Sequence, residues 1–516
     1  MFLSAILVII SISLYLYITR KCNYWEERGV KYVKPVPFFG SNFENYILRC
    51  SLTETFTRWY REYPNEKVVG YFRSTEPGLL VRDPEIVKRV LITDFAYFYE
   101  RGILRDKTSI EPILRNLFFA EGDLWRLLRQ RMTPAFTSGK LKNMFHLITE
   151  RAEQLQLRAL KAARSGRTID ARDLMARYTT DVIGACGFGL DAVSLNEDDS
   201  AFRRLGAQIF EHSLKKALIA IIKDFFPSIS KNLKHLGDVE KPLVSLVNQI
   251  LKQRKYEPSE RNDFIDLLLD ARKKGVIEVE SLEKINKGGN PERVSLELTD
   301  QLIAAQVFVF FAAGFETSSS ATSYTLHQLA FNPEVQKKVQ REIDMVLSKH
   351  NQKFTFDAIS ELTYLDWTFK EGMRLFPSLG YLARKCTRKF TIPELNLTID
   401  EGVTVSIPLE GLQTDPQYFE DPFTFRPERF DPENNKKINK YIYMPFGEGP
   451  RACIGARLGH MQSLAGLATI LSKFTVEPAP ETKRRLSVEP KIDVVQNIKG
   501  GIPLRFIERK SFVQEP

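Results

Sequence analysis

The sequence predicts a mainly α-helical protein with small β-sheets, formed as one body behind an N-terminal membrane anchor helix. Three observations lead to this fold class. The first 19 residues are almost free of charge. Helical periodicity extends through most of the chain up to about residue 380, in long segments such as Gly139–Ala163 and Glu334–Leu347. Short strand-like segments occur near Val68–Val81 and around Phe390–Ile407.

Residues 1–19 are predicted to be a transmembrane anchor. From Phe2 to Thr19 there is no charge, and these 18 residues would span about 27 Å as a helix, close to one hydrocarbon core. Arg20 and Lys21 follow the run, which favours a cytoplasmic location for the rest of the chain. The alternative is a cleaved secretory signal, but there the basic residues precede the apolar run, and no small-residue cleavage site is evident.

Residues 20–41 are predicted to form a basic, proline-rich hinge. Pro35 and Pro37 prevent the anchor helix from continuing, and Gly40 permits a turn. Such a connector sets the orientation of the globular body relative to the membrane. Residues 42–516 follow as one body, in which no internal repeat is visible.

Two stretches of the body depart from the helical pattern. The later part of Lys252–Ser295, the most polar interior stretch, is expected to be a surface loop. Residues 420–445 contain four prolines and little periodicity, which is typical of an irregular segment with a function. The formal net charge is +10, but lysine and arginine are scattered. This argues against a nucleic-acid partner and favours a basic face for an acidic protein or an anionic membrane.

The chain has five widely spaced cysteines and no CxxC pair. Zinc and iron–sulfur sites are therefore not expected, and neither is a disulfide-rich secreted scaffold. Four of the cysteines are expected to be small apolar residues in a reducing compartment: Cys22, Cys50, Cys186 and Cys386. The fifth, Cys453, lies in the stretch PFGEGPRACIG (Pro445–Gly455) and needs another explanation.

Cys453 lies where a helical pattern begins, because apolar residues recur at steps of three and four after it. A helix N-terminus favours a thiolate there. Arg451 supplies a fork suited to a carboxylate, and Phe446 can shield the sulfur from water. Three glycines let the backbone turn tightly and approach a flat group: Gly447, Gly449 and Gly455.

A thiolate placed in this way is a metal ligand or a nucleophile. A nucleophile needs a neighbouring base. His460 is the histidine nearest in sequence, but it lies about two turns along the same helix and cannot reach Cys453. The residues therefore favour Cys453 as a metal ligand.

The pattern FxxGxRxCxG resembles that of the cytochromes P-450, the haem-thiolate monooxygenases. The resemblance implies a cytochrome P-450 fold for residues 42–516, which would form the haem-binding monooxygenase domain. It also implies haem b (iron protoporphyrin IX) as cofactor, with Cys453 as the proximal iron ligand. In that family the thiolate pushes electron density through the iron and favours O–O cleavage.

FFAAGFETSSS (Phe310–Ser320) matches a second family pattern, Ala/Gly-Gly-x-Asp/Glu-Thr, in a long apolar helical run. The resemblance implies that this helix crosses the oxygen-binding face of the haem. Thr317 would orient water and help to deliver protons, and Glu316 would be the acid of the relay. The alternative for Thr317 is a hydroxyl bonded to the preceding helical turn.

Four residues match the family's contacts to the haem propionates. WRLLR places Trp125 and Arg129 four residues apart on one helical face, although a snorkelling arginine on an amphipathic helix would read the same way. Arg384 and Arg451 match two further contacts. Three arginines suit a cofactor with two carboxylates.

Glu371 and Arg374 have the i, i+3 spacing of a pair that is usually exposed and contributes about 0.2–0.5 kcal/mol. In the family, the residues that match Glu371, Arg374 and Arg429 form a buried charge network on the cysteine side. The resemblance therefore implies a structural role for all three, which is to fix geometry rather than to add net stability.

The stretches YWEERGVKYVKP and FFAEGDLWRLLRQRMTPAFTSGKLKNMF look most like insect family-6 microsomal enzymes. The implied reaction converts RH, O2 and NADPH into ROH, water and NADP. Because no nucleotide-binding signature is present, electrons would come from NADPH–cytochrome P-450 reductase, with cytochrome b5 as an optional second donor, at the endoplasmic reticulum membrane. Basic residues that could dock these acidic partners, or simply be solvated, are Arg126, Lys436, Lys437, Lys440 and Arg457.

The substrate is expected to be small and apolar, because the stretches over the haem are aromatic and aliphatic. The candidate substrate residues, any of which could instead be plain core, are Phe118, Phe119, Val309, Phe310, Ala313, Leu379 and Tyr381. The stretch Val495–Ile498 is a further candidate wall. The resemblance suggests plant toxins or insecticides as substrates, with hormone or lipid hydroxylation as the alternative.

Three other functions are weighed against this one. A haem-thiolate isomerase or dehydratase would use a peroxide and no reductase, and the intact Glu316–Thr317 pair argues against it. A haem carrier or gas sensor would not consume oxygen with reductase present. A membrane-anchored interaction protein would bind no haem at all.

Overall fold

The structure is a computed structural model of Met1–Pro516. It describes residues 20–104, 110–190, 193–197, 200–210, 236–261, 263–286, 288–491 and 494–510, together with residues 6, 216, 218–219, 222–223 and 233–234. Apart from Ile6, the predicted anchor of residues 1–19 lies outside the described residues.

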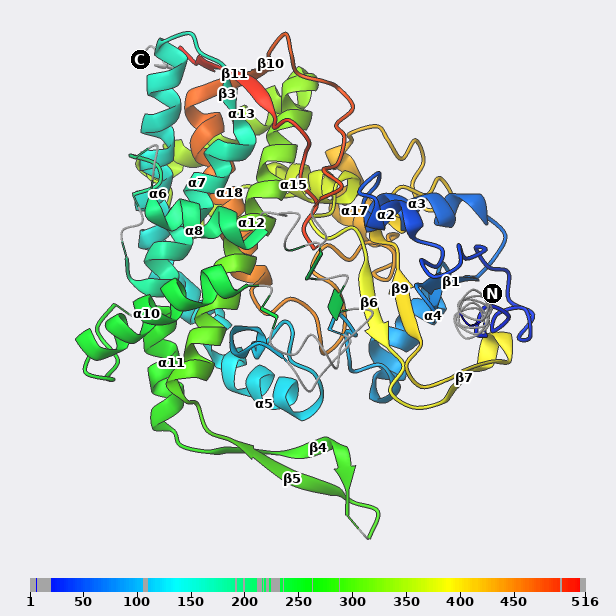
Figure 1. Ribbon diagram of the computed structural model, residues 1–516. Coiled ribbons are helices and arrows are strands. Elements are labelled where there is room, and N and C mark those ends of the chain that lie inside the picture. Colours follow the sequence, from blue (N-terminus) through cyan, green and yellow to red (C-terminus); the bar gives the residue numbers. More distant parts are fainter. Residues whose placement is uncertain are drawn as a thin grey trace.

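Helices make up most of the described chain (Figure 1). The α-helices are α2 (Phe43–Tyr46), α3 (Leu52–Glu62), α4 (Pro84–Lys88), α5 (Gly122–Met132), α6 (Ser138–Arg164), α7 (Ala171–Ile183), α8 (Ala201–Phe210), α10 (Gly237–Gln253), α11 (Phe264–Lys273), α12 (Asp300–Phe331), α13 (Pro333–Lys349), α14 (Phe356–Glu361), α15 (Thr363–Leu375), α16 (Leu409–Gln413), α17 (Pro432–Asn435) and α18 (Ala456–Lys473). Short 3-10 and π turns join them: η1 (Arg89–Thr93), η2 (Phe95–Tyr97), η3 (Pro112–Leu114), η4 (Thr133–Phe136), η5 (Gly184–Phe188), η7 (Pro393–Leu395) and η8 (Pro427–Phe430).

The strands form four small sheets. They are β1 (Val68–Arg73), β2 (Glu76–Val81), β3 (Ile169–Asp170), β4 (Ile277–Ile285), β5 (Pro291–Leu296), β6 (Leu382–Lys385), β7 (Phe390–Ile392), β8 (Leu397–Ile399), β9 (Thr404–Ile407), β10 (Phe474–Pro478) and β11 (Pro503–Glu508). The largest sheet has the order β1-β2-β9-β6, in which β2 and β9 run parallel and the outer pairs run antiparallel. The predicted fold class, mainly α with small β-sheets, is confirmed.

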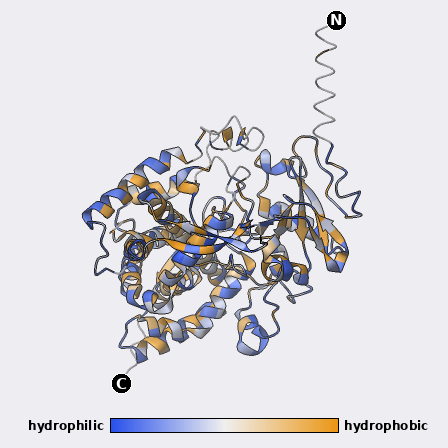
Figure 2. Ribbon diagram, turned by 90° about the horizontal axis from the view of Figure 1, so that it is seen from below, coloured by the Kyte–Doolittle hydropathy of each residue, from blue (hydrophilic) through white to orange (hydrophobic). Residues whose placement is uncertain are grey.

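The interior has two hydrophobic clusters. One surrounds α12 and includes residues of α6, α7, α15 and α18, and the other fills the space around the β1-β2-β9-β6 sheet. Figure 1 shows the helical part on the left and this sheet on the right. Helices at the periphery are hydrophilic on one side and hydrophobic on the other (Figure 2), as expected for helices that cover a core.

Helix α12 lies at the centre of the helical cluster. Its Thr299 N-cap accepts a hydrogen bond from Leu302 N, and its sequence is apolar on all sides. By length and composition it could cross a membrane, but 78% of its most apolar window is buried inside the structure. A helix that is hydrophobic all round belongs in a core, and α12 is a core helix.

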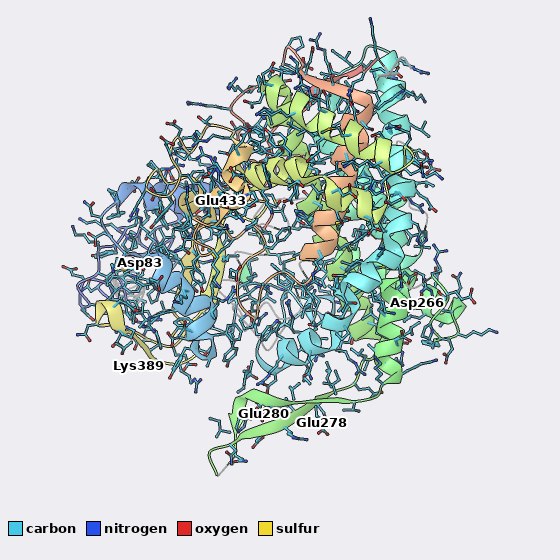
Figure 3. All side chains as sticks on the ribbon, turned by 180° about the vertical axis from the view of Figure 1, so that it is seen from behind. Asp83, Asp266, Glu278, Glu280, Lys389 and Glu433 are labelled. Atoms are coloured by element: carbon cyan, nitrogen blue, oxygen red, sulfur yellow. The ribbon has the colours of Figure 1, made fainter. Side chains whose placement is uncertain are left out.

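The surface loop expected in the later part of Lys252–Ser295 is instead a β-hairpin, so this prediction was wrong. Strands β4 and β5 pair antiparallel and project from the body, as Figure 3 shows with Glu278 and Glu280 labelled. Burial alternates along β4, where Val279 and Ser281 are buried between exposed neighbours. The high polarity of this stretch concealed that period-2 pattern.

Candidate functional site

The loop before α18 presents Cys453. Gly447 and Gly449 both have positive φ, and a Cβ on Gly449 would lie 2.1 Å from the backbone oxygen of Leu91, so only glycine fits there. The loop is closed by hydrogen bonds from Cys453 N to Phe446 O at 2.8 Å and from Ala452 N to Gly449 O at 2.9 Å. The backbone is thereby fixed on both sides of the sulfur, three residues before α18 begins.

The side chain of Cys453 is close to other parts of the protein on several sides. Its own surface is exposed, yet the surrounding protein is close enough that burial raises the pKa of the thiol. The Gly455 N–H and the charges of Arg129 and Arg101 act in the opposite direction and favour the thiolate. A bound metal ion would deprotonate the thiol outright.

Four arginines lie in the same region, and burial lowers the pKa of each. The pKa falls to about 10 for Arg101, about 9 for Arg384 and about 8 for Arg451. Arg129 is the fourth. Their mutual repulsion contributes, because Arg101 and Arg384 each lower the pKa of Arg451.

Two carboxylates oppose these four guanidinium groups among the described residues. Glu121 accepts from Arg451 Nη2 at 2.6 Å, and Glu100 acts on Arg451 at longer range. Counted over these described groups, four guanidinium groups face two carboxylates in a largely buried position. The Nε of Arg384 is moreover buried with no hydrogen-bond partner in the described chain. Such an excess is costly unless an anion is present, and it fits a ligand with two carboxylates.

Trp125 and Arg129 both project from α5 toward the Cys453 loop. Arg129 Nη1 donates to Ala452 O at 2.7 Å, and the guanidinium of Arg451 lies 4.1 Å from the Trp125 ring centroid. Arg451 itself is fully engaged, since it also donates to Tyr99 O and Ala120 O. The structure thus brings Trp125, Arg129, Arg384 and Arg451 into one region.

The sequence analysis did not identify two members of this cluster, Arg101 and Glu121. Arg101 donates to Phe118 O and Arg451 O, and its backbone N–H donates to Glu121. Glu121 also accepts from Gly102 N. No spacing rule links Arg101 to Arg451, and a lone arginine or glutamate in a loop carries no sequence signal of this role.

One stripe of α12 is left open although most of this helix is buried. Ala313 is exposed, and Val309, Phe310, Gly314 and Thr317 are half-buried. These positions share one side of the helix. Thr317 Oγ1 donates to Ala313 O at 2.8 Å, the local bond that the alternative interpretation anticipated.

Gly314 lets α12 and α7 come close. A Cβ at this position would lie 2.4 Å from Ile183 Cδ1 of α7. Helix α18 is bonded to the same turn of α12, because Gln462 Nε2 donates to Gly314 O at 2.9 Å and to Ser318 Oγ at 2.7 Å. The helix that follows Cys453 is therefore fixed directly to the open stripe of α12.

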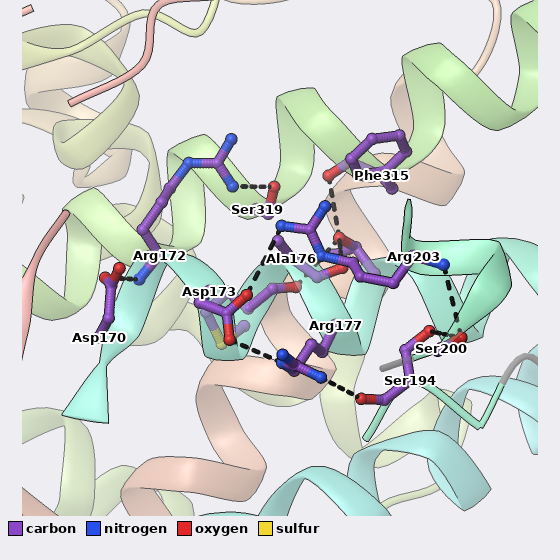
Figure 4. A network of polar contacts seen from close by, with 12 residues as sticks. Asp170, Arg172, Asp173, Ala176, Arg177, Ser194, Ser200, Arg203, Phe315 and Ser319 are labelled. Atoms are coloured by element: carbon purple, nitrogen blue, oxygen red, sulfur yellow. Dashed lines mark hydrogen bonds and ion pairs between the residues drawn. The ribbon is translucent and has the colours of Figure 1, made fainter. Parts of the chain in front are cut away.

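Glu316 points away from this stripe and forms a buried ion pair with Arg172 of α7. Arg172 also donates to Ser319 Oγ at 2.6 Å, a contact visible in Figure 4. In the same view, Asp173 contacts Arg177 and Arg203 beside this pair. Glu316 is therefore held by cations, with no hydrogen bond to Thr317 in the described chain.

The seven candidate substrate residues come from α12, from the segment before α5 and from the segment before β6. Val309 and Ala313 belong to the open stripe, whereas the Phe310 ring stacks on Phe264 of α11 at 4.2 Å. The Tyr381 ring packs against Phe56 of α3 at 5.0 Å.

The other candidates lie beside the arginine cluster or next to β6. Phe118 contacts Phe119 edge-on and lies under Arg101. Leu379 is half-buried. Leu382, which the sequence analysis missed, lies 3.9 Å from where a Cβ of Gly447 would be, next to the Cys453 loop.

Glu371, Arg374 and Arg429 form a buried charge network. Arg374 donates through Nε and Nη2 to both oxygens of Glu371, at 2.7 and 2.8 Å, and both side chains have no exposed surface. Arg429 Nε donates to Glu371 Oε1 at 3.3 Å. The remaining Arg374 donors bond Gln413 O and Pro422 O, so the network fixes the segment that leads to Cys453.

The proposed docking residues differ in their surroundings. Arg126 donates to Glu280 O of the β4–β5 hairpin at 2.7 Å, and Arg457 donates to Ser138 Oγ at 3.1 Å. Lys436 pairs with Glu433 at 2.9 Å, and Lys437 and Lys440 are exposed.

The thiol of Cys453, the excess of guanidinium groups over carboxylates near it among the described residues, and the accessible side of α12 suit a cofactor that is held by a sulfur ligand and carries two negative charges. This is the site of the haem-thiolate proteins, and the residues present fit haem. The cytochrome P450 family model matches residues 30–504, and the chain belongs to the cytochrome P450 family.

Curated relatives come from insects. Cytochrome P450 6B7 of Helicoverpa armigera is 38% identical over 515 residues, which cover 99% of each chain. Cytochrome P450 6B1 of Papilio polyxenes is 36% identical over 514 residues, 99% of this chain and 100% of the relative. Probable cytochrome P450 6a18 of Drosophila melanogaster is 35% identical over 492 residues, 94% and 95% of the two chains. The resemblance to insect family-6 enzymes is confirmed, and the protein is an oxygen-incorporating haem-thiolate monooxygenase.

Proposed function

We propose that the protein hydroxylates small apolar compounds taken up by an insect, such as plant toxins or insecticides, with electrons that NADPH supplies through a separate reductase. The open stripe of α12 carries the proposal, because Val309 and Ala313 offer an apolar wall beside the half-buried hydroxyl of Thr317. The full-length similarity to insect family-6 proteins supports it. The uncharged run Phe2–Thr19 supports an anchor in the endoplasmic reticulum membrane with the body in the cytoplasm.

The side chains have separate tasks in this proposal. When bound, haem supplies the oxygen chemistry. Cys453 would provide its sulfur ligand, the carbonyl of Phe446 holds the backbone of Cys453, and the Phe446 ring would shield the sulfur from water. Arg384, whose Nε has no partner in the described chain, would hold the two propionates together with Arg101, Arg129 and Trp125, while Glu121 keeps Arg451 in place.

The substrate class is tested with purified protein, reductase and NADPH. We expect apolar plant compounds and insecticides to shift the haem spectrum and to be converted to products that contain one added oxygen atom. Steroid hormones and fatty acids serve as the comparison panel. Selective binding and turnover of the comparison panel would instead assign the protein to hormone or lipid hydroxylation.

Replacing Thr317 by alanine should uncouple NADPH consumption from product formation. The half-buried hydroxyl of Thr317 belongs to the open stripe, and we infer that it exchanges its bond to Ala313 O for water that carries protons. We expect the yield of product per NADPH to fall by roughly 100-fold at most, the lower range for a positioned acid–base group. Thr317→Ser, which keeps the hydroxyl, is the control, and equal coupling in all three proteins would remove Thr317 from this role.

Replacing Arg384 by leucine should weaken haem retention and leave the fold intact. Its guanidinium is buried with an unpartnered Nε, so the variant removes an uncompensated charge from the protein. Losing one charge-assisted hydrogen bond to a propionate should raise the rate of haem transfer to a scavenging apoprotein about tenfold. Lys385→Leu, one residue along β6, is the control. A transfer rate equal to that of the unmodified protein would show that Arg384 does not hold the cofactor.

A further inference from the structure

A cavity lies between the end of α5, the turn η4 and the end of α11, and its walls include no member of the arginine cluster or of the open stripe of α12. Its volume is about 360 Å³, within the range of about 300–1,000 Å³ that is usual for small-molecule sites. Figure 1 shows α5 and α11 next to each other above the β4–β5 hairpin, and Ile277 of β4 lines the cavity as well.

The floor of this cavity is apolar. It is formed by Met132, Phe264 and Leu268, which are buried, and by Leu267, which is half-buried. An alkyl chain placed on this floor would leave water, and each buried methylene group strengthens binding about fourfold. The floor therefore suits an apolar chain.

The rim of the cavity is cationic. Arg131, Lys140 and Lys274 line it, and Asp270 is the one carboxylate among the lining residues that the structure describes. The ammonium groups of Lys140 and Lys274 form no ion pair with any described residue, and neither does the carboxylate of Asp270. Three cations thus face one anion at the mouth of an apolar cavity.

Arg131 is held in place without a counter-charge. Its Nη2 donates to two carbonyl oxygens at the end of α11, those of Ala271 and Gly275, the second at 2.6 Å. Its Nε and Nη1 make no hydrogen bond within the described ranges. Burial lowers the pKa of this guanidinium, as expected for a cation without a carboxylate beside it. Two donors of a fixed cation are therefore available to a ligand.

The Phe264 ring connects the cavity to the haem site. Besides lining the cavity, it stacks on Phe310 of the open stripe with ring centroids 4.2 Å apart. Phe136 of η4 contacts both rings, at 5.7 and 5.8 Å. A Cβ on Gly455 would lie 3.9 Å from Phe136 Cε1, and the Gly455 N–H favours the thiolate of Cys453. Because interiors are close-packed, a shift of Phe264 is passed to Phe136 and to the backbone beside the sulfur.

We propose that this cavity binds an amphipathic anion, an alkyl carboxylate of medium chain length, and that its occupancy changes the surroundings of the Cys453 sulfur through Phe264 and Phe136. The carboxylate lies at Arg131 and the two lysines, and the chain lies on the apolar floor. A neutral apolar ligand would leave the cations unpaired, and a small inorganic anion would leave the floor uncovered. The inference goes beyond the proposed function and depends on neither its substrates nor its electron donor.

The site is tested by titration calorimetry of the holoprotein with decanoate. The double variant Lys140→Gln/Lys274→Gln should bind decanoate about fivefold more weakly, a modest loss because exposed charge pairs are screened by water. The matched control is Lys142→Gln/Lys273→Gln, which removes the same charge from the same two helices. Lys142 and Lys273 pair with Asp357 and Glu257 and do not line the cavity, so this variant should bind like the unmodified protein.

Two further ligands separate the contributions of chain and charge. Octanoate, which is two methylene groups shorter, should bind to the unmodified protein roughly 15-fold more weakly than decanoate. Decanol, which has the chain without the charge, should bind equally to the two double variants. A decanol affinity that fell in Lys140→Gln/Lys274→Gln would show that this variant damages the cavity itself and would contradict recognition of the carboxylate.

The connection to Cys453 is tested by the absorption spectrum of the reduced carbonyl complex. Decanoate should shift its maximum in the unmodified protein and in Lys142→Gln/Lys273→Gln at the same half-maximal concentration. In Lys140→Gln/Lys274→Gln that concentration should rise about fivefold, in step with the affinity.

Equal decanoate affinities in the two double variants overturn the site. An affinity that depends on Lys140 and Lys274 without a spectral shift overturns the connection through Phe264 and leaves the site standing. A shift with the same half-maximal concentration in both variants places the effective decanoate on the open stripe of α12 and likewise overturns the connection. None of these results bears on the proposed substrates, which the oxygenated products test separately.

Discussion

Cys453→Ser is expected to abolish monooxygenase turnover and the spectral signature of thiolate ligation in the reduced carbonyl complex. A serine hydroxyl does not ionise at neutral pH and is a much weaker electron donor than a thiolate. The loop geometry would persist, because the bonds from Cys453 N to Phe446 O and from Ala452 N to Gly449 O involve only backbone atoms. We expect turnover to fall by more than about 100-fold, beyond the loss caused by changing a partner in the outer shell of a metal site.

The control for this variant is Cys22→Ser, since Cys22 is a half-buried cysteine outside the site. It should leave the spectrum and turnover unchanged. If the Cys453 variant kept a thiolate-type spectrum with full turnover, another residue would be the ligand, and the assignment of the site would be wrong.

Glu371→Gln should destabilise the folded protein more than any other substitution considered for the charged residues. Glu371 is fully buried and forms ion pairs with both Arg374 and Arg429. Replacing its carboxylate by a neutral amide leaves these two buried guanidinium groups without their counter-charge. Burial already lowers the pKa of Arg429 against the attraction of Glu371. Breaking a buried pair costs about 3–5 kcal/mol, which should lower the denaturation midpoint followed by haem absorbance and reduce the yield of holoprotein.

Glu334→Gln provides a matched control for that experiment. Glu334 and Lys337 have the same i, i+3 spacing on α13, with side chains that are 79% and 58% exposed. Their pairing is screened by water, so the midpoint should not move. Equal denaturation midpoints for the Glu371 and Glu334 variants would show that burial does not determine how much the charge network contributes to folding stability.

The helices were well predicted where the apolar pattern was regular. The segment predicted as Gly139–Ala163 is α6, Ser138–Arg164, and that predicted as Glu334–Leu347 is α13, Pro333–Lys349. Helical periodicity is a local property, and one buried stripe fixes it. The β4–β5 hairpin was missed because its exposed charges masked the alternation of a few buried side chains.

In the candidate site, too, some residues could be predicted from the local sequence and others could not. Cys453, with its glycines and Arg451, is recognisable because the loop and the helix that follow are contiguous in sequence. Arg101 and Glu121 were not found, because they meet Arg451 only after some 330–350 residues of chain have folded back.

The sequence by itself determined which residues can ligate a metal, which segments are helical and to which family the chain belongs, because these properties depend on side-chain chemistry and local spacing. The i, i+3 spacing by itself does not distinguish Glu371–Arg374 from Glu334–Lys337, and only the family resemblance implied that the first pair is buried. Only the tertiary structure decided that one pair is fully buried under further bonds to Gln413 O and Pro422 O while the other remains in solvent. The strength of a charge pair depends on how completely the surrounding fold excludes water. The spacing of two residues in the sequence does not show how much water is excluded.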